Sequence, residues 1–552
     1  MKNSPSFAIY FSSDAYSTAN KMMGRQSAGK AFMKGVARTW PNEPVRGLGH
    51  DARSAQSMAK QLKDDGFKGS LEWSTLPDWR SAQVAGTLYY PAPPTKDLAA
   101  ARNLVSPAAF SLMGVTHTLS STGAMDQVAD LVLPPFKPWD ALICTSRAAH
   151  TFVSGLQDEM RAYWRETTGA NRFVDVQLPL IPLGIDAPAF APQPAARPAA
   201  RVALALGEQE TAFLFAGRLS FHAKANPAPL YQALETASKD RPITCIEAGV
   251  FPNDSIKQGY LAAQKALAPS VRFIYVDGQD EVRYRQVWQA ADVFVSLSDN
   301  IQETFGLTPL EAMAVGLPVI VSDWDGYKDT VRHEVDGLRV PTVMPPAGSG
   351  PDLALRHALG LDTYDFFIGR TSLATVVEPE ALAQAVSRLA ASPELRRTFG
   401  AAGRARALAE FDWPVILLRY AELAGQLTNL RQRHAGAAPQ PWPQRGDPFW
   451  RFGHFPSATL GGSWMVKARP DLAARLRVLL SLTMASYAFG EGDVLRVTVQ
   501  EIADLLSKCE AQSVNAALAA TGHASPSGVR ALMWLWKFDL IQVIPPRAQQ
   551  SA

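Results

Sequence analysis

The sequence predicts an α/β protein built from two doubly wound parallel sheets, followed by a small and mostly helical third part. At 552 residues the chain is too long for a single hydrophobic core. Short, continuous apolar runs alternate with helical stretches, as buried parallel strands do. Two Pro- and Ala-rich stretches, 187–200 and 434–450, read as linkers. We therefore expect domains at 1–186, 201–433 and 451–552.

The apolar runs place the expected strands along both α/β domains. The first domain has "FAIYF" and "LICTS", and the second has "FLFAG", "ITCIEAG", "VRFIYVDG", "DVFVSLS" and "PVIVS". Open parallel sheets bind ligands beyond the carboxyl ends of their strands, so two such domains in tandem should face a cleft. An insertion at 342–378 lies between a strand and the helix that begins near Pro379, and is expected to form a loop or flap.

The composition is that of an ordinary soluble protein. The hydrophobic fraction is 47%, the charged fraction is 19%, and the formal net charge of +3 is too small to argue for nucleic acid. Cys144, Cys245 and Cys509 form no CxxC pair, so we expect buried reduced thiols and neither a disulfide framework nor a zinc site. Without a signal-peptide pattern or a membrane-length apolar run, the expected location is cytoplasmic.

The turn in "FLFAGRLSFHAKANP" carries two cations. A strand leads into Gly217, and Arg218 and Lys224 follow before the next helix. A guanidinium and an ammonium can neutralise a diphosphate without a metal ion. The alternative is that Arg218 pairs with a carboxylate and Lys224 is solvated. The turn therefore suggests an anion site.

A second turn, in "DVFVSLSDNIQETFGLTPLEAMAVG", points to the same edge of the second sheet. The helix should begin near 307–309, because proline is favoured in a first turn. The free N–H groups of Gly306, Leu307 and Thr308 and the positive end of the helix dipole would then face the cleft. This is a second expected anion site, opposite the first.

Two glutamates, Glu303 and Glu311, flank this second turn with seven residues between them. A carboxylate accepts two hydrogen bonds and so suits a vicinal diol, one of which could be a ribose and the other a hexose. Two alternatives remain open on the residues alone. Glu311 could be a carboxylate that stabilises the helix dipole, and Glu303 could be a glycosidase-type nucleophile.

Several ordered segments resemble retaining GT-B glycosyltransferases of family 4. "ETFGLTPLEAMAVGLPVIVSDWDGYKDTVRHEVDGLRVP" is similar to the family's E-x7-E signature, and "FAGRLSFHAKANP" is similar to its Gly-Arg-Leu segment. The lysine of that segment lies one residue later than in many members. "ALICTSRAAHTFV", "LIPLGIDAPAF" and the stretch from "AVSRLAASPEL" to "LLRYAEL" resemble the family's domain exit and its closing helices, which cross back to the first domain. The resemblance covers roughly residues 5–430.

The resemblance implies a role for each residue of these turns. Arg218 and Lys224 would bind the donor diphosphate, Glu303 the hydroxyls of the donor sugar, and Glu311 the ribose. The remaining donor-binding residues would be Gly217, Thr304, Phe305, Gly306, Leu307 and Thr308. It also implies that neither a metal nor a cofactor is needed. Retention would come from same-face attack without a protein nucleophile, which argues against that role for Glu303.

The first domain contributes weaker candidates. Gly24 and Gly29, in "MGRQSAGKAFMKGVAR", would let a loop pass close to phosphate or acceptor before a helix, or are plain turn glycines. His117 follows a strand and resembles a family histidine near the donor sugar, although a structural role is equally consistent. Ser120, Ser121 and Thr122 could contact acceptor or cap a helix.

The segment 451–552 lies outside the family core. Its predicted helices and short final strand faintly suggest a winged helix, but few basic residues gather on one helix, so nucleic acid is not expected. A module for a protein partner or self-association is the favoured interpretation.

The leading hypothesis for the whole chain is a retaining transferase that uses a nucleotide sugar. Its acceptor would be a carbohydrate, a lipid-linked molecule or a protein, and peripheral membrane association is compatible with this. A sugar phosphorylase or sugar-phosphate synthase of the same fold is one alternative. A non-catalytic nucleotide-sugar sensor is the alternative from another class.

Overall fold

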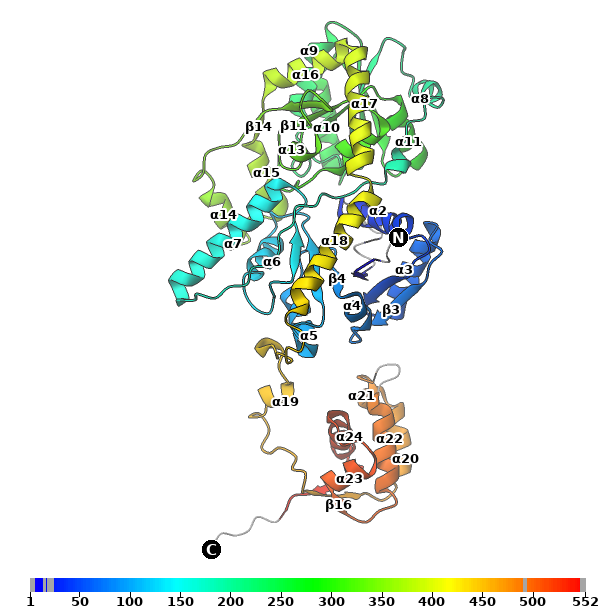
Figure 1. Cartoon of the computed structure of the whole chain (residues 1–552), viewed down its shortest axis with the longest axis vertical. Coiled ribbons are helices and arrows are strands. Elements are labelled where there is room, and N and C mark those ends of the chain that lie inside the picture. Colours follow the sequence, from blue (N-terminus) through cyan, green and yellow to red (C-terminus); the bar gives the residue numbers. More distant parts are fainter. Residues whose placement is uncertain (1–4, 13–15, 17–23, 490–493, 547–552) are drawn as a thin grey trace. The chain divides into compact units, whose positions relative to one another are not determined.

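The computed structural model describes residues 5–12, 16, 24–489 and 494–546. The chain forms two compact units, 1–442 and 443–552, which are described separately (Figure 1). No helix in the described ranges combines the length and the apolar character needed to cross a membrane.

The first domain of unit 1 is a parallel sheet with helices on both faces. In the described part its six strands are ordered β3-β2-β1-β4-β5-β6. The strands are β1 (Ala8–Tyr10), β2 (Val45–Gly49), β3 (Leu71–Thr75), β4 (Thr87–Tyr89), β5 (Ser111–Val115) and β6 (Ala141–Ile143). The helices are α2 (Gly24–Thr39), α3 (Ala52–Asp64), α4 (Arg80–Ala85), α5 (Lys96–Val105), α6 (Thr122–Asp130) and α7 (Arg147–Thr168).

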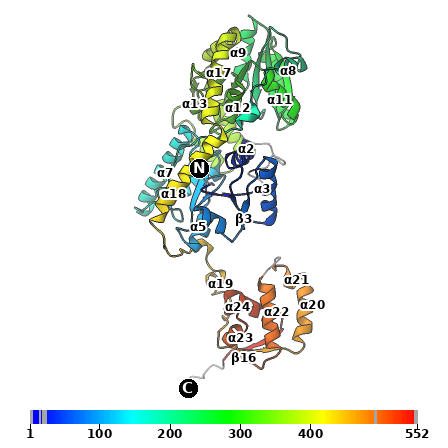
Figure 2. The same ribbon diagram turned by 45° about the vertical axis from the view of Figure 1, so that its right-hand side comes forward.

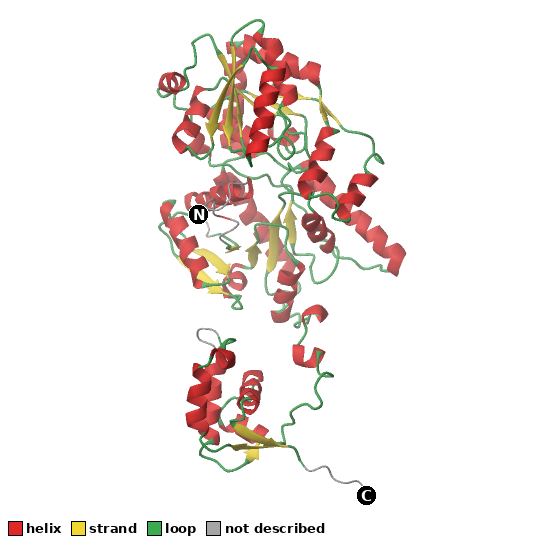
Figure 3. Ribbon diagram, turned by 180° about the vertical axis from the view of Figure 1, so that it is seen from behind, coloured by secondary structure: helices red, strands yellow, loops and turns green. Residues whose placement is uncertain are grey.

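The second domain repeats this plan, and Figure 3 shows helices on both sides of its sheet. Its described strands are ordered β12-β11-β10-β7-β8-β9. They are β7 (Thr211–Ala216), β8 (Ile243–Gly249), β9 (Arg272–Asp277), β10 (Val293–Ser296), β11 (Val319–Ser322) and β12 (Gly337–Val340). The helices are α9 (Ala228–Ser238), α10 (Asp254–Leu267), α11 (Glu281–Ala290), α12 (Leu307–Val315), α13 (Tyr327–Thr330), α16 (Pro379–Ala391) and α17 (Pro393–Glu410).

The two sheets share one winding scheme, which confirms the predicted fold class. In each, the first strand of the domain lies between the second and the fourth, so the strand order reverses at β1/β4 and at β7/β10. Ligands of such sheets bind at this reversal, beyond the carboxyl ends of the strands. The continuous apolar run of β7, in which all six residues are buried, is what a central parallel strand requires.

The chain crosses between the two domains twice, at adjacent points. Ile185 pairs with Asp412 as a parallel bridge, and the Trp413 N–H donates to the Ile185 carbonyl at 3.1 Å. Arg38 of α2 donates to Asp412 at 2.9 and 2.7 Å and to Asp186 at 3.1 Å. One guanidinium therefore holds both crossings, and its hydrogen bonds to Asp412 outweigh burial and raise the pKa of Arg38.

Helix α18 (Trp413–Gln432) follows the second crossing and packs on the first domain, as Figures 1 and 2 show. Its Trp413 meets the Phe32 ring edge-on at 5.3 Å, and Tyr420 lies 5.7 Å from the ring of Tyr89. Gly35 of α2 is needed here, because a Cβ would lie 2.4 Å from the Trp413 Cβ. The core of the first domain thus includes the last helix of unit 1.

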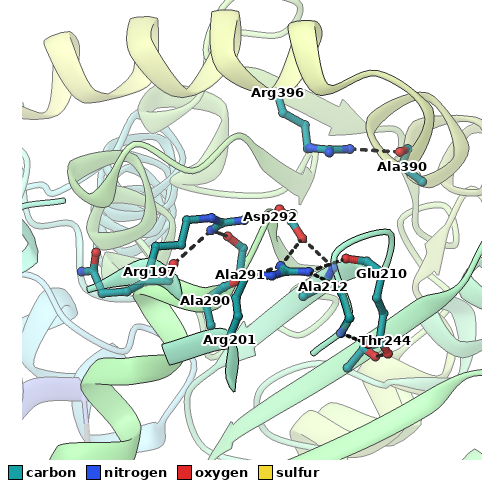
Figure 4. Close-up of polar contacts among 12 residues, drawn as sticks. Arg197, Arg201, Glu210, Ala212, Thr244, Ala290, Ala291, Asp292, Ala390 and Arg396 are labelled. Atoms are coloured by element: carbon teal, nitrogen blue, oxygen red, sulfur yellow. Dashed lines mark hydrogen bonds and ion pairs between the residues drawn. The ribbon is translucent and has the colours of Figure 1, made fainter. Parts of the chain in front are cut away.

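The Pro/Ala-rich stretch after residue 186 is not loose chain. It holds the short 3₁₀ helix η1 (Ala187–Phe190) and α8 (Arg197–Ala203). Arg197 and Arg201 both bind Asp292 at the start of β10, at 2.5 and 3.1 Å, as Figure 4 shows. Arg197 also donates to the Ala291 carbonyl at 2.6 Å. Ion pairs and hydrogen bonds therefore hold this stretch against the second sheet.

The second Pro-rich stretch also begins in an ordered way. The Gln440 N–H donates to the Asn103 carbonyl at 2.7 Å, and Ser106 Oγ donates to the Ala437 carbonyl at 2.9 Å. Lys137 adds a hydrogen bond to the Gln440 side chain at 2.8 Å. Residues 434–442 therefore lie along the first domain and belong to unit 1.

The insertion is a helical hairpin on a small base. β13 (Thr342–Val343) and β14 (Val376–Val377) pair antiparallel, and α14 (Pro351–Ala358) and α15 (Tyr364–Leu373) lie between them. Asp362 accepts from Arg356 at 3.0 Å and pairs with Arg370 at 3.2 Å, which fixes the connection between the two helices. The insertion is thus a folded element.

Unit 2 has a core of its own around a three-stranded antiparallel sheet of order β16-β15-β17 in its described part. Trp534 is buried in it and donates to the Ala485 carbonyl at 2.9 Å. Cys509 lies on the surface of this unit, so the expectation that all three thiols are buried was wrong for this residue. The elements are η2 (Pro443–Arg445), α19 (Pro448–Arg451), β15 (Met465–Ala468), α20 (Leu472–Ser481), α21 (Thr483–Ser486), α22 (Val494–Leu506), β16 (Gln512–Ser513), α23 (Val514–Ala520), α24 (Pro526–Lys537) and β17 (Ile541–Ile544).

Candidate donor site

The predicted site residues gather where the strand order of the second sheet reverses. Arg218 and Lys224 lie on the loop after β7, and Glu303 lies on the loop after its neighbour β10. The two loops are joined by hydrogen bonds from Asn300 Nδ2 to the Lys224 carbonyl and from Gln302 Nε2 to the Ala223 carbonyl, both 2.8 Å. Parallel pairing of adjacent strands therefore brings together residues almost eighty positions apart.

Lys224 and Glu303 form an ion pair across these loops, with less than a fifth of either side chain exposed. Burial alone would raise the pKa of Glu303, but the charge and hydrogen bond of Lys224 and the N–H groups of Phe305 and Thr304 lower it. Burial would lower the pKa of Lys224, but Glu303 raises it. Both groups are therefore charged at neutral pH.

Arg218 is positioned by its own loop. Its Nη2 donates to the Ala223 carbonyl at 3.1 Å, which directs the guanidinium along the turn. Gly217, which precedes Arg218, has φ of +147°. A Cβ on Gly249 would lie only 1.7 Å from the Gly217 carbonyl oxygen. The two glycines let this turn approach the end of β8.

Helix α12 starts where the sequence predicted, directly after the loop that carries Glu303. Gly306 caps it with φ of +81°, and a Cβ at this position would lie 1.9 Å from the Tyr327 ring. Phe305 is buried beneath the turn. Leu307 and Thr308 form the first turn of the helix, where backbone N–H groups lack partners within the helix.

Glu311 is the fifth residue of α12, and its pKa is shifted in the opposite direction from that of Glu303. Burial raises its pKa to about 7, although the charge of Lys224 acts in the opposite direction. Its charge also contributes to raising the pKa of the nearby Tyr284 on α11, for which burial is the larger cause. The two glutamates therefore differ in charge state near neutral pH, one held as a carboxylate and the other divided between both forms.

Two further residues of the site, Tyr327 and Asp325, come from the segment after β11. This segment is part of the family resemblance in the sequence, but neither residue was predicted to belong to the site. Tyr327 is fully buried, and its hydroxyl forms a hydrogen bond of 2.7 Å with Ser296 Oγ. It lies within electrostatic range of Lys224 and Glu303. Asp325 has φ of +43°, and burial raises its pKa to about 8. Their position just beyond a strand end was the available signal.

Asp325 also contacts the first domain. Ser146, the N-cap of α7, lies 3.3 Å from Asp325 Oδ1 and donates to the Thr304 carbonyl at 2.9 Å. Arg147 pairs with Asp329 at 2.5 Å beside it. The N-terminus of α7 therefore rests on the loop that follows Glu303.

The insertion contacts the first domain at the segment after β5, the strand next to β6. Tyr364 of α15 hydrogen-bonds Ser120 Oγ at 2.8 Å, and His357 of α14 hydrogen-bonds Thr122 Oγ1 at 3.1 Å. Ser121 between them caps α6 by accepting from the Ala124 N–H at 3.4 Å. Of the two uses foreseen for these hydroxyls, the structure shows capping for one, and the other two bind the insertion.

The remaining candidates of the first domain are Gly24, Gly29 and His117. Gly24 and Gly29 lie within helix α2, so the prediction that they form a loop before that helix was wrong, and residues 17–23 lie outside the described ranges. His117 Nε2 donates to the Pro91 carbonyl at 3.2 Å. Gly29 and His117 line one small cavity of the first domain, together with Tyr16, Ala28, Phe32, Tyr89, Pro91, Leu183 and Trp413.

No group of three or more His, Cys, Asp or Glu side chains is placed to hold a metal ion within the described ranges. The site brings together Arg218, Lys224, Glu303, Glu311 and the N-terminus of α12. Cations and a helix N-terminus are able to bind an anion, and carboxylates are able to accept hydrogen bonds from hydroxyls.

Residues 196–345, which carry all of these turns, match the family model described as glycosyl transferases group 1. A D-inositol 3-phosphate glycosyltransferase of Jonesia denitrificans is 35% identical over 186 residues, covering 32% of this chain and 42% of that protein. The alpha-maltose-1-phosphate synthase of Mycolicibacterium smegmatis is 31% identical over 131 residues, covering 24% and 26%. The chain thus aligns with less than half of the length of either relative.

A solved structure shares the fold over a longer span. The glycosyltransferase from Rickettsia africae ESF-5 superimposes with a TM-score of 0.50 at 11% identity, covering 76% of this chain and 98% of that one. Unit 1 therefore has the GT-B fold, with two facing domains of the same winding. Residues 196–345 of its second domain are similar to the group 1 glycosyl transferases.

Proposed function

We propose that this chain is a retaining glycosyltransferase that moves a sugar from a nucleotide-sugar donor to a hydroxyl group of an acceptor. The observation that carries the proposal is the meeting of Arg218, Lys224, Glu303 and the start of α12 at the strand reversal of a group 1 domain. The acceptor would be a glycan, a lipid-linked molecule or a protein.

The electrostatics of the site support this chemistry. As the anomeric C–O bond stretches, negative charge grows on the leaving diphosphate, and two cations and a helix N-terminus oppose it without a metal. The acceptor hydroxyl would attack from the face that the diphosphate leaves. Glu303 is held by Lys224 as a hydroxyl-binding carboxylate, which supports a positioning role over a nucleophilic one.

Donor binding should exchange partners within the Lys224–Glu303 pair. In the structure each is the counter-ion of the other. A bound donor would offer phosphate oxygens to Lys224 and sugar hydroxyls to Glu303. Such an exchange leaves neither charge buried without a partner, which would be strongly destabilising.

A thermal-shift screen of nucleotides and nucleotide sugars tests the donor half of the proposal, since a specific ligand raises apparent stability by mass action. The donor found there should be turned over with an acceptor panel. Arg218→Ala and Lys224→Ala should abolish the shift and the transfer, whereas Arg285→Ala, on an exposed face of α11, should retain both. Binding without turnover on any acceptor would favour the nucleotide-sugar sensor.

A sugar-phosphate product or acceptor is the second candidate. It is favoured by the names of two relatives, a D-inositol 3-phosphate glycosyltransferase and an alpha-maltose-1-phosphate synthase. The acceptor panel should therefore include phosphorylated polyols and sugar 1-phosphates beside glycans and lipid-linked acceptors. Transfer that requires the acceptor phosphate would select this candidate.

A further inference from the structure

Asp325 is an acidic residue at the contact between the two domains of unit 1. It lies on the loop after β11, and its φ of +43° is uncommon for a residue other than glycine. Its Oδ2 is buried and has no hydrogen-bond partner among the described residues. Backbone outliers and buried polar atoms without a partner are concentrated at functional sites, so both features point to a role for this side chain.

The turn that carries Asp325 is packed against the loop after Glu303. A Cβ on Gly326 would lie 2.5 Å from Phe305 Cα and 2.7 Å from the Phe305 carbonyl oxygen, so only glycine fits there. The N–H groups of Thr304 and Phe305 hydrogen-bond the Glu303 carboxylate. The turn at Asp325 therefore supports the backbone that holds Glu303.

Ser146 connects this turn to the first domain. It is the N-cap of α7, is fully buried, and accepts from the Ala149 N–H at 3.0 Å. Its Oγ lies 2.9 Å from the Thr304 carbonyl oxygen and 3.3 Å from Asp325 Oδ1. A hydroxyl has a single hydrogen, and both of these neighbours are acceptors when Asp325 is a carboxylate. One of the two oxygens would then face Ser146 Oγ without a hydrogen between them.

A proton on Asp325 removes this conflict. Ser146 then donates to the Thr304 carbonyl, which is the shorter of its two contacts, and Asp325 donates to Ser146 Oγ. Every oxygen of the chain from Asp325 to Thr304 has a hydrogen to share in this arrangement. The geometry of the contact therefore favours the acid form of Asp325.

The charges around Asp325 favour the same form. The titratable groups that face it are Glu303, Asp329 and Tyr327. Burial is the largest cause that raises the pKa of Asp325 to about 8, and the two carboxylates act in the same direction. Hydrogen bonds from the next backbone N–H and from the N-cap of α7 oppose this shift without reversing it. The cations beside these carboxylates are already paired, Lys224 with Glu303 and Arg147 with Asp329.

We propose that Asp325 is a positioning residue of the donor site and that it acts in its protonated form. Through Ser146 it joins the first domain to the Thr304 peptide, whose N–H holds the Glu303 carboxylate. Loss of the proton removes a hydrogen bond between the domains and places a second negative charge beside Glu303. This role rests on the proposed transferase function, whereas the protonated contact itself does not.

Chemical denaturation of the full chain between pH 5 and pH 9 tests the contact without a donor. An acid whose pKa is raised on folding, here from 3.8 to about 8, loses stability as the pH rises between these values. The unfolding constant of the wild type, divided by that of Asp325→Asn, should therefore rise about tenfold per pH unit up to pH 8 and then level off. A constant ratio would overturn the proposal.

Turnover tests the positioning role. At saturating donor and acceptor, the wild-type kcat should fall about tenfold from pH 7 to pH 9 as one proton is lost near pH 8. Asp325→Asn should keep the wild-type kcat at pH 7 and show no such fall, because its amide donates to Ser146 at every pH. Asp325→Ala should have a kcat at least about tenfold lower at both pH values, with the donor Kd unchanged.

The matched control is Asp323→Asn. It alters a carboxylate on the same loop, which pairs with Arg339 at 3.2 Å, and it leaves Asp325 in place. Its kcat should follow the wild-type pH profile. In a Ser146→Ala background, the advantage of Asp325→Asn over Asp325→Ala should disappear, because the shared partner is gone.

Three kinetic results would contradict the positioning role: a fall in Asp325→Asn that matches the wild type, an equal loss in Asp325→Asn and Asp325→Ala at pH 7, or an advantage of asparagine that persists without Ser146. If the wild type transfers no sugar from any donor while the pH dependence of unfolding is as expected, the transferase proposal fails and the positioning role fails with it. The protonated contact between the domains then stands.

Discussion

The environments of Glu303 and Glu311 differ, although both residues flank one turn. Glu303 has a buried counter-ion, whereas burial dominates the pKa of Glu311. If the donor proposal holds, Glu303→Ala should chiefly reduce kcat, because sugar positioning is lost. Glu311→Ala should chiefly weaken nucleotide binding. Steady-state kinetics and equilibrium binding of both variants distinguish these effects, and identical profiles would contradict the division.

The raised pKa of Glu311 predicts a pH dependence for donor binding. A ribose diol needs the carboxylate form, and the free chain holds this group with a pKa of about 7 instead of its ordinary 4.5. Protonation therefore opposes binding, and affinity for a nucleotide sugar should rise about tenfold from pH 6 to pH 8 and then level off. Titration calorimetry with a nucleotide sugar, which has no group of its own titrating in this range, measures the change.

The matched variant is Glu311→Gln, which keeps the shape and removes the titration. Its nucleotide-sugar affinity should be nearly flat between the same pH values. A wild-type affinity that does not change, or a variant that retains the full rise, would assign the dependence to another group.

At the scale of elements, the hairpin of α14 and α15 joins the donor loops to the first domain. Tyr364→Phe and Ser120→Ala each remove the same hydrogen bond of 2.8 Å. Each should lower the free energy of unfolding by roughly 0.5–1.5 kcal/mol, the contribution of such a bond to stability, and chemical denaturation measures the loss. The double variant should be no less stable than either single one.

Tyr163→Phe provides the control for this cycle, because Tyr163 lies more than half exposed on α7. Its free energy of unfolding should equal that of the wild type. Additive losses in the double variant would mean that Tyr364 and Ser120 act separately.

The crossings between the domains depend on Arg38. Arg38→Ala leaves Asp186 with Lys34 alone and leaves Asp412 without its bidentate partner. We expect a loss of about 1–3 kcal/mol in the free energy of unfolding, because partly buried carboxylates lose charged hydrogen bonds. Chemical denaturation measures it. Lys60→Ala, which removes an exposed pair on α3, should cost less than about 0.5 kcal/mol, and a similar loss in both would refute this role.

The elements of the donor site followed from the sequence because local signals were enough. An apolar run, a glycine and a proline in a first turn locate β10, Gly306 and the start of α12. The partners that come from elsewhere could not be found in this way. Ser146, Tyr364 and Asp325 reach the site through tertiary packing, and nothing in their neighbouring residues indicates which surface they meet. The same limit explains the error at Gly24 and Gly29, where flexible residues lie inside a helix that packing stabilises.

At the scale of the whole molecule, unit 2 should fold independently of unit 1. It has its own core, in which Val466, Ile502 and Leu532 are fully buried. A chain that ends after Trp442 should therefore keep the nucleotide-sugar affinity of the full chain, and calorimetry of the full chain should show two unfolding transitions, of which the ligand shifts one. Aggregation of the shortened chain or loss of its affinity would show that unit 1 needs unit 2.

The adjacent crossings at Ile185 and Asp412 have a mechanical consequence. Two connections that run side by side and are hydrogen-bonded to each other resist twisting of one domain against the other, yet each can bend at the same level. We expect the two domains of unit 1 to rotate relative to each other about a single axis that passes through these residues. The Arg38 guanidinium is hydrogen-bonded to both connections and therefore keeps them aligned during this motion.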